Sequence, residues 1–176
     1  MQSTQFVQCT FAQHAAAILA ILNDAIIHTT ALYDYQPRTM ANMADWFAAK
    51  QAGHFPVIGL ENEQGELMGF ASYGAFRAFP AYKYTVEHAV YVAQTFRGRG
   101  LGEALLLELI KVAQAQGKHV LVGAIDAENH GSIALHTKLG FTCSGILPQV
   151  GFKFGRWLDL VFYQKVLATP ESPVDG

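Results

Sequence analysis

The stretch RGRGLG, residues 97–102, places three glycines and two arginines in six consecutive positions. Gly98, Gly100 and Gly102 relax the steric limits on the backbone, and the Leu-rich segment that follows predicts a helix. Unpaired N–H groups at the start of a helix, together with the positive end of its dipole, bind anions such as phosphate. The stretch therefore predicts an anion-binding loop, with a purely structural helix-capping loop as the alternative.

Two common nucleotide motifs fit this loop poorly. A P-loop ends in Gly-Lys-Ser/Thr, whereas Glu103 and Ala104 follow Gly102 here. A dinucleotide fingerprint belongs to the first βαβ unit of a chain and has an acidic residue about 20 positions further on. This loop lies in the middle of the chain and its spacing differs. On its own the loop is a weak signal for any one ligand.

Outward from the loop, apolar periodicity predicts one α/β domain with a mixed sheet. In the helix expected over 101–117, Leu101, Leu105, Leu109 and Val112 share one face. We expect further helices over 15–30, 39–51 and 129–140, and strands over 4–9, 56–62, 66–76, 86–94, 119–126, 141–152 and 157–167. Residues 1–168 are expected to form the domain, and the Pro-rich residues 169–176 a flexible tail.

The composition narrows the class of protein. Of the 176 residues 51% are hydrophobic and 15% charged, which predicts a compact globular chain. A formal net charge of −2 argues against a nucleic-acid-binding surface. The two cysteines, Cys9 and Cys143, make no disulfide framework and no zinc pattern, so no metal site is expected, and Cys143 is predicted to be a core residue. With no signal peptide and no apolar run near 20 residues, we expect a cytoplasmic protein that does not enter a membrane.

Two motifs carry a family resemblance. R-x-x-G-x-G from Arg97 to Gly102, preceded by HAVYVAQ, resembles the acetyl-CoA pyrophosphate loop of the GNAT N-acetyltransferase superfamily. The segment NHGSIALHTKLGF, residues 129–141, resembles that superfamily's second CoA-contacting helix. TVEHAVYV, GFKFGRWLDLVFYQ and a histidine at 136, where most members have tyrosine, resemble the branch of phosphinothricin and methionine sulfone/sulfoximine N-acetyltransferases. The resemblance implies a mostly antiparallel twisted sheet of about six or seven strands, about four helices, and a homodimer.

The resemblance also implies which residues hold acetyl-CoA. The loop would donate its N–H groups to the pyrophosphate, and each of Arg97 and Arg99 is either a phosphate contact or a solvated surface residue. The strand at Val90–Val92 would splay from its neighbour, so that its backbone pairs with the pantetheine arm and one N–H meets the thioester oxygen. Asn129 is expected to cap its helix and to contact the same arm. The expected cofactor residues are Val90, Tyr91, Val92, Arg97, Gly98, Arg99, Gly100, Leu101, Gly102, Asn129, Ser132 and His136.

For catalysis, Glu87 is the expected base. A free α-amine has a pKa of about 8 and must lose a proton before it attacks, and a strand-end carboxylate can take that proton directly or through water. A solvent-exposed glutamate without a role is the alternative. His136 or Tyr163 would assist the leaving thiolate, unless they only pack. By strand alternation His88 lies on the face opposite Glu87, as a substrate contact or a core residue.

Substrate selection is expected in residues 77–85 and in the loop between the first two helices. The guanidinium of Arg77 suits a carboxylate or phosphinate, and aromatic side chains would wall a small cavity unless they cover the core or an interface. These are Phe76 and Tyr84, with Tyr33 and Tyr35 as weaker candidates.

The leading hypothesis is transfer of acetyl from acetyl-CoA to the α-amine of phosphinothricin, methionine sulfone or methionine sulfoximine, by direct attack in a ternary complex. A polyamine, an aminoglycoside or a protein N-terminus is the alternative acceptor, although Arg77 and Lys83 favour anionic or zwitterionic substrates. A CoA-binding sensor without catalysis is a further alternative, and the presence of Glu87, Asn129 and His136 speaks against it.

Overall fold

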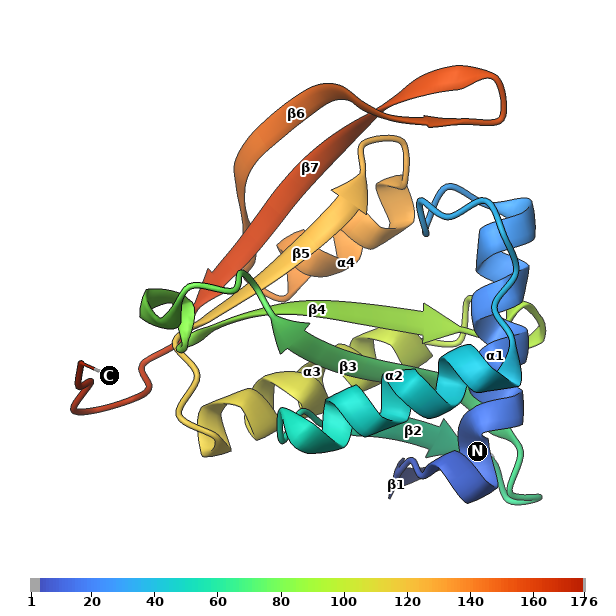
Figure 1. Ribbon diagram of the computed structural model, residues 1–176, viewed down its shortest axis with the longest axis horizontal. Coiled ribbons are helices and arrows are strands. Elements are labelled where there is room, and N and C mark those ends of the chain that lie inside the picture. Colours follow the sequence, from blue (N-terminus) through green and yellow to red (C-terminus); the bar gives the residue numbers. More distant parts are fainter. Residues whose placement is uncertain (1–3, 176) are drawn as a thin grey trace.

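The computed structural model describes residues 4–175. Seven strands form one sheet in the order β1-β2-β3-β4-β5-β7-β6 (Figure 1). The strands are β1 (Gln5–Gln8), β2 (Val57–Glu61), β3 (Leu67–Ala75), β4 (Thr85–Val92), β5 (Val120–Asp126), β6 (Thr142–Lys153) and β7 (Arg156–Val166). The helices are α1 (Phe11–His28), α2 (Met40–Ala52), α3 (Leu101–Ala115) and α4 (His130–Lys138), with short 3-10 turns η1 (Pro80–Tyr82) and η2 (Gln94–Phe96). Only β4 and β5 pair in parallel. The predicted mixed, mostly antiparallel sheet with four helices is therefore confirmed.

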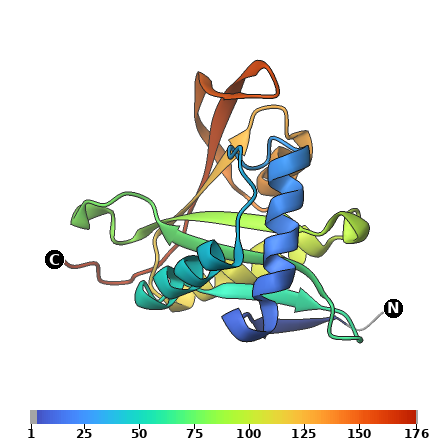
Figure 2. The same cartoon turned by 45° about the vertical axis from the view of Figure 1, so that its right-hand side comes forward.

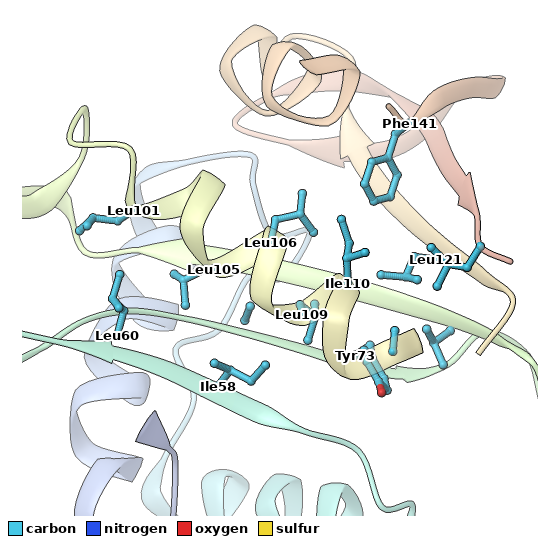
Figure 3. Close-up of a cluster of buried hydrophobic side chains, with 14 of the residues drawn as sticks. Ile58, Leu60, Tyr73, Leu101, Leu105, Leu106, Leu109, Ile110, Leu121 and Phe141 are labelled. Carbon is cyan, nitrogen blue, oxygen red and sulfur yellow. The ribbon is translucent and has the colours of Figure 1, made fainter. Parts of the chain in front are cut away.

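The helices cover opposite faces of the sheet and bury two apolar clusters. On one face, the predicted stripe of α3 is buried at Leu101, Leu105 and Leu109, while Val112 is partly buried. Figure 3 shows this stripe packed over Ile58 of β2. On the other face, α1 and α2 pack over β2 and β3. Burial of these side chains, at about 25 cal/mol per Å² of apolar surface, is the main stabilising contribution to the fold.

Two helix starts depend on particular residues. Gly100 is the N-cap of α3 with φ 77°, a left-handed conformation that favours glycine. Asn129 is the N-cap of α4, as predicted, and its side chain accepts a hydrogen bond of 3.1 Å from Ser132 N. Both residues begin the helices that border the same gap in the sheet.

That gap lies between β4 and β5. Their parallel pairing runs from Thr85↔Val120 to His88↔Gly123 and then stops, although β4 continues to Val92 and β5 to Asp126. Figure 1 shows the two strands diverging from that point. The expected splay of β4 from its neighbour is thus present, and the backbone of residues 90–92 lacks a β5 partner.

The far end of the β6–β7 hairpin extends beyond the other strands of the sheet (Figures 1 and 2). Lys153, near its tip, is buried, and its Nζ donates to the carbonyl oxygens of Ile26, Thr29 and Leu32 at 2.6–2.8 Å. One ammonium group thereby ties the hairpin to the end of α1 and to the loop that leads into α2.

The placement of Cys143 corrects a prediction. Cys143 is exposed on β6, whereas Cys9 is buried. The apolar neighbours of Cys143 in sequence belong to β6, a strand whose residues are nearly all exposed. An apolar run alone could not distinguish such a strand from the core.

Two further segments bear on the predictions. Among the described residues α1 is the one helix long and apolar enough to be compared with a membrane span, and seven of its residues are buried in this fold. The C-terminal segment is bonded to the domain: Thr169 Oγ1 donates to Lys118 O and Val174 N donates to the Tyr84 hydroxyl.

Candidate active site

A cavity of about 360 Å³ opens where β4 and β5 diverge; we name it the cleft cavity. It reaches from the glycine loop to the junction of the two strands. Its lining comprises Ala31, His88, Ala89, Val90, Tyr91, Val92, Phe96, Arg97, Gly98, Gly100, Leu101, Gly102, Gly123, Ala124, Ile125, Asp126, Asn129, Gly131, Ser132, Leu135 and His136. Eleven of the twelve expected cofactor residues are in this set, and Arg99 is not.

The glycine loop forms one end of the cleft cavity. Gly98 and Gly100 have φ 76° and 77°, and a Cβ at either would meet no atom within 4 Å. The first turn of α3 has no side-chain cap, which leaves its leading N–H groups to a ligand or to water. An open, uncapped helix start behind two left-handed glycines fits a phosphate group.

The two arginines of the loop differ in direction. Arg97 lines the cavity, donates from Nε to Val92 O at 3.1 Å, and pairs with Asp24 at 3.4 Å. Arg99 donates to Thr95 O at 3.2 Å and stacks over Phe96. Arg97 is therefore the arginine of the loop whose charge lies at the cleft cavity.

Two buried histidines meet at the inner end of the cleft cavity. His88 Nε2 lies 2.8 Å from His136 Nε2, and the rings stack with centroids 5.1 Å apart. They pack directly over Gly123, where a Cβ would lie 3.0 Å from His136 Nε2. Burial lowers the pKa of both imidazoles, so both are neutral near pH 7.

The hydrogen bonds assign the tautomers of this pair. His136 Nδ1 lies 2.7 Å from the Ser132 carbonyl, which can only accept, so Nδ1 carries the proton. His136 Nε2 then accepts from His88 Nε2–H, and the buried His88 Nδ1 has no hydrogen-bond partner among residues 4–175. Both nitrogens of His136 are engaged, and contact with a ligand requires it to exchange one of these bonds.

Tyr163, the other expected helper of the leaving thiolate, lies elsewhere. It pairs with Gly123 and Cys143 across the sheet and packs against the α3-side core. Its side chain is not among those lining the cleft cavity. The structure thus brings His136, rather than Tyr163, to the site.

A second cavity, of about 500 Å³, lies on the α1/α2 face of β3 and β4; we name it the acceptor cavity. Its lining comprises Leu22, Leu32, Arg38, Trp46, Lys50, Phe70, Ser72, Gly74, Ala75, Phe76, Arg77, Glu87, His88, Ala89 and Tyr91. It shares His88, Ala89 and Tyr91 with the cleft cavity. The two cavities therefore meet at β4, beside the point where β5 leaves it.

Glu87, Arg77 and Phe76 gather in the acceptor cavity, as expected. Arg77 Nη1 lies 3.7 Å from Glu87 Oε2, and the guanidinium stacks over Phe76 at 4.1 Å. Burial raises the pKa of Glu87, and the charge of Arg77 opposes that rise. A carboxylate with a raised pKa is a stronger base than an exposed one.

The expected tyrosines do not line either cavity. The Tyr84 hydroxyl bonds to the backbone of Val174, and the Tyr35 hydroxyl donates to Phe152 O. The Tyr33 hydroxyl donates to the buried Asp126 at 2.7 Å. These rings instead fasten the C-terminal segment, the hairpin and the end of β5.

Sequence reasoning missed two cations of the acceptor cavity. Arg38 comes from the loop between α1 and α2. This loop was expected to select the substrate, but through Tyr33 and Tyr35. Lys50 lies on α2, where its Nζ donates to Tyr73 O at 2.7 Å and stacks over Trp46. Burial lowers the pKa of Lys50 to about 8. The position of Lys50 on the face of α2 that points to the sheet is the sequence feature that could have identified it.

Comparisons with known proteins agree with this geometry. Residues 18–141 match the model of the acetyltransferase (GNAT) family. The chain is 51% identical over 147 residues to the L-methionine sulfoximine/L-methionine sulfone acetyltransferase of Pseudomonas paraeruginosa, covering 84% of this chain and 86% of that one.

Solved structures are similar over nearly the whole chain. An N-acetyltransferase from Staphylococcus aureus is 46% identical with a TM-score of 0.90, covering 93% of this chain and 98% of that one. A phosphinothricin acetyltransferase from Sinorhizobium meliloti in complex with acetyl-CoA is 32% identical with a TM-score of 0.91, covering 97% and 92%.

Proposed function

The chain belongs to the GNAT family of acetyltransferases, and from that premise we propose that it acetylates the α-amine of a small amino-acid analogue. The acceptors we propose are methionine sulfone, methionine sulfoximine and phosphinothricin, and the acetyl donor is acetyl-CoA. One observation carries the proposal: a cavity that ends in a phosphate-type loop meets, at β4, a cavity that holds a carboxylate and cations.

Acetyl-CoA supplies an activated acetyl thioester, and the residues of the cleft cavity fit it. The start of α3 and Arg97 would hold the pyrophosphate, while the unpaired backbone of Val90–Val92 would pair with the pantetheine arm. Asn129 uses its side-chain oxygen to cap α4, which leaves its amide group as a donor. The arrangement positions a thioester near the junction of β4 and β5.

Glu87 is the proposed base. It lies beside the residues shared by the two cavities, and its raised pKa suits proton removal from an ammonium group. Direct attack by the resulting amine needs both reactants present together, which two adjoining cavities allow. His136 is the proposed partner of the leaving thiolate because it lines the cleft cavity. The proton it can donate is the Nδ1–H, which must then exchange its bond to the Ser132 carbonyl.

Arg77 is the proposed partner of the α-carboxylate. Its guanidinium lies next to Glu87, as the carboxylate lies next to the amine in an amino acid. Arg38, Lys50 and Arg77 outnumber Glu87 in the acceptor cavity. This balance favours a zwitterion or anion over a polyamine or aminoglycoside, which are polycations.

The test is a panel of amines assayed with acetyl-CoA by thiol release. We expect turnover with methionine sulfone, methionine sulfoximine or phosphinothricin and none with polyamines or aminoglycosides. Glu87→Gln should lower kcat/KM at neutral pH by about 100-fold or more, because the carboxylate is the proton acceptor. Lys111→Gln, at an exposed position of α3, serves as the control. Full activity of Glu87→Gln would remove Glu87 as the base, and acetylation of polycations alone would overturn the substrate class.

We also propose a homodimer that works in the cytoplasm. Large apolar side chains lie exposed on the hairpin: Ile146, Leu147, Val150, Phe152, Phe154 and Trp157, which together we name the hairpin patch. A concentration of exposed apolar side chains on one element is typical of an interface. A second copy of the chain is its proposed occupant.

A further inference from the structure

We propose that Arg38 forms a second anion-binding position in the acceptor cavity, which recognises the oxygen-rich head of the substrate's side chain. The inference rests on the proposed function and deepens it. Arg77 would hold the α-carboxylate, whereas Arg38 would distinguish a phosphinate or sulfone from an apolar side chain. Arg38 would then determine which amino acids the enzyme prefers.

The backbone of Arg38 is held in place from α1. Arg38 N donates to Asn23 Oδ1 at 2.7 Å, and Asn23 Nδ2 donates to Arg38 O at 3.1 Å. Pro37 precedes it, and Thr39 follows as the N-cap of α2. These bonds fix the backbone of Arg38, and therefore the point at the cavity from which its side chain starts.

The guanidinium of Arg38, in contrast, is unengaged. Each of the other four arginines has a side-chain hydrogen bond or ion pair: Arg77, Arg97, Arg99 and Arg156. Within residues 4–175, Arg38 alone has none, although it is half-buried and lines the acceptor cavity. A half-buried cation with five free donors is available to a ligand.

Arg38 and Arg77 mark two ends of the cavity. Arg77 pairs with Glu87, whereas Arg38 is held against Asn23 of α1. The charge of Arg38 also opposes the rise that burial gives to the pKa of Tyr91. Glu87 and Tyr91 lie on the same face of β4, four residues and therefore about 13 Å apart along the strand. A substrate whose amine meets Glu87 can hold its carboxylate at one cation and extend its side chain towards the other.

The wall between these ends is aromatic. The Phe70 and Tyr91 rings lie 5.5 Å apart and the Trp46 and Phe70 rings 6.2 Å apart, all lining the cavity. Such a surface suits the methylene groups of an amino-acid side chain. A planar guanidinium pairs best with two oxygens on one atom, so an anionic phosphinate should gain more than a neutral sulfone.

The experiment compares Arg38→Gln and Arg38→Lys with the wild type on phosphinothricin and methionine sulfone. For Arg38→Gln we expect kcat/KM for phosphinothricin to fall roughly 10- to 100-fold, mainly through KM, and that for methionine sulfone to fall less. Arg38→Lys should restore part of the loss for phosphinothricin because it keeps the charge. The KM for acetyl-CoA and the thermal midpoint should match those of wild type and of Lys111→Gln.

An equal fall on both substrates, or no fall on either, would overturn the role of Arg38. Calorimetric titration of the protein with phosphinothricin, in the presence of CoA, makes the same comparison without turnover. If wild type turns over neither substrate, the proposed function fails, yet weaker phosphinothricin binding by Arg38→Gln would still support the binding position. If wild type does not bind phosphinothricin at all, the proposal for Arg38 fails as well.

Discussion

At the scale of single residues, Glu87 lies under two opposing influences. Burial in the acceptor cavity raises its pKa, and the Arg77 guanidinium 3.7 Å away opposes that rise. A base works only when deprotonated, so activity is lost as pH falls through its pKa. Arg77 would therefore extend the working range of Glu87 towards lower pH, in addition to its proposed contact with the substrate carboxylate.

Replacing Arg77 should move the acidic limb of the pH profile. In Arg77→Gln the pKa of Glu87 is no longer lowered by a neighbouring cation, so the limb of kcat/KM should shift to higher pH. Arg77→Lys, which keeps the charge, should retain the wild-type position. Loss of carboxylate binding lowers kcat/KM at every pH and leaves the midpoint in place, which separates the two effects. A limb that stays put or moves to lower pH would contradict the coupling.

The histidine pair shows how far sequence reasoning reached at this scale. Helical spacing placed Asn129 and His136 on one face of α4, and strand alternation separated Glu87 from His88. The 2.8 Å contact between His88 and His136 was not predictable, because it joins residues 48 positions apart across the sheet. Arg38 was missed for a related reason: nothing local indicates which loop residue reaches a cavity built by other elements.

At the scale of elements, the predictions were good wherever a segment packs against the sheet. The helix expected over 101–117 is Leu101–Ala115, and that expected over 39–51 is Met40–Ala52. The hairpin strands were also found, but burial was wrong at Cys143. Apolar content predicts which segments tend to be buried. It does not show whether such a segment packs in the core of its own chain or stays on the surface.

The ammonium of Lys153 links two such elements. Its three carbonyl partners lie at the end of α1 and in the following loop, which contributes Ala31 to the cleft cavity and Leu32 to the acceptor cavity. Three protons on one tetrahedral nitrogen match three acceptors. The hairpin thus fixes a loop that borders both cavities.

Replacing Lys153 should lower both the stability of the protein and its affinity for substrates. Lys153→Met leaves buried carbonyls without a donor, and we expect the free energy of unfolding to fall by about 2–4 kcal/mol. The KM values of both substrates should rise because the loop is released. Urea denaturation and initial rates measure the two effects, with the exposed Lys111→Met as the matched control. Unchanged stability would show that the three bonds contribute nothing net.

At the scale of the whole molecule, the sheet consists of two parts that join only over four residue pairs of β4 and β5. β1–β4 carry α1, α2 and α3, whereas β5, β7 and β6 lie beside α4 and extend into the hairpin (Figure 2). The hairpin patch lies on this second part. Six large apolar side chains on one hairpin are the feature that a partner subunit would cover.

A charge within the hairpin patch should therefore weaken self-association. Trp157 is 61% exposed and packs edge-on against Phe152. Trp157→Asp should shift the protein from dimer to monomer in sedimentation velocity, because a carboxylate cannot be buried cheaply in an apolar interface. Leu107→Asp, at an exposed position on α3, is the control and should sediment like wild type. A wild type that sediments as a monomer at all concentrations would refute the dimer.

The part of β4 that lines both cavities has a consequence for the order of substrate binding. His88, Ala89 and Tyr91 line both cavities, so on the proposed function the donor and the acceptor would approach β4 from different cavities. Filling one cavity would leave the other free, so we expect the two substrates to bind in random order. After the proposed transfer, CoA and the acetylated product would likewise leave from different cavities. The strand shared by the two cavities thus favours binding of the two substrates in either order.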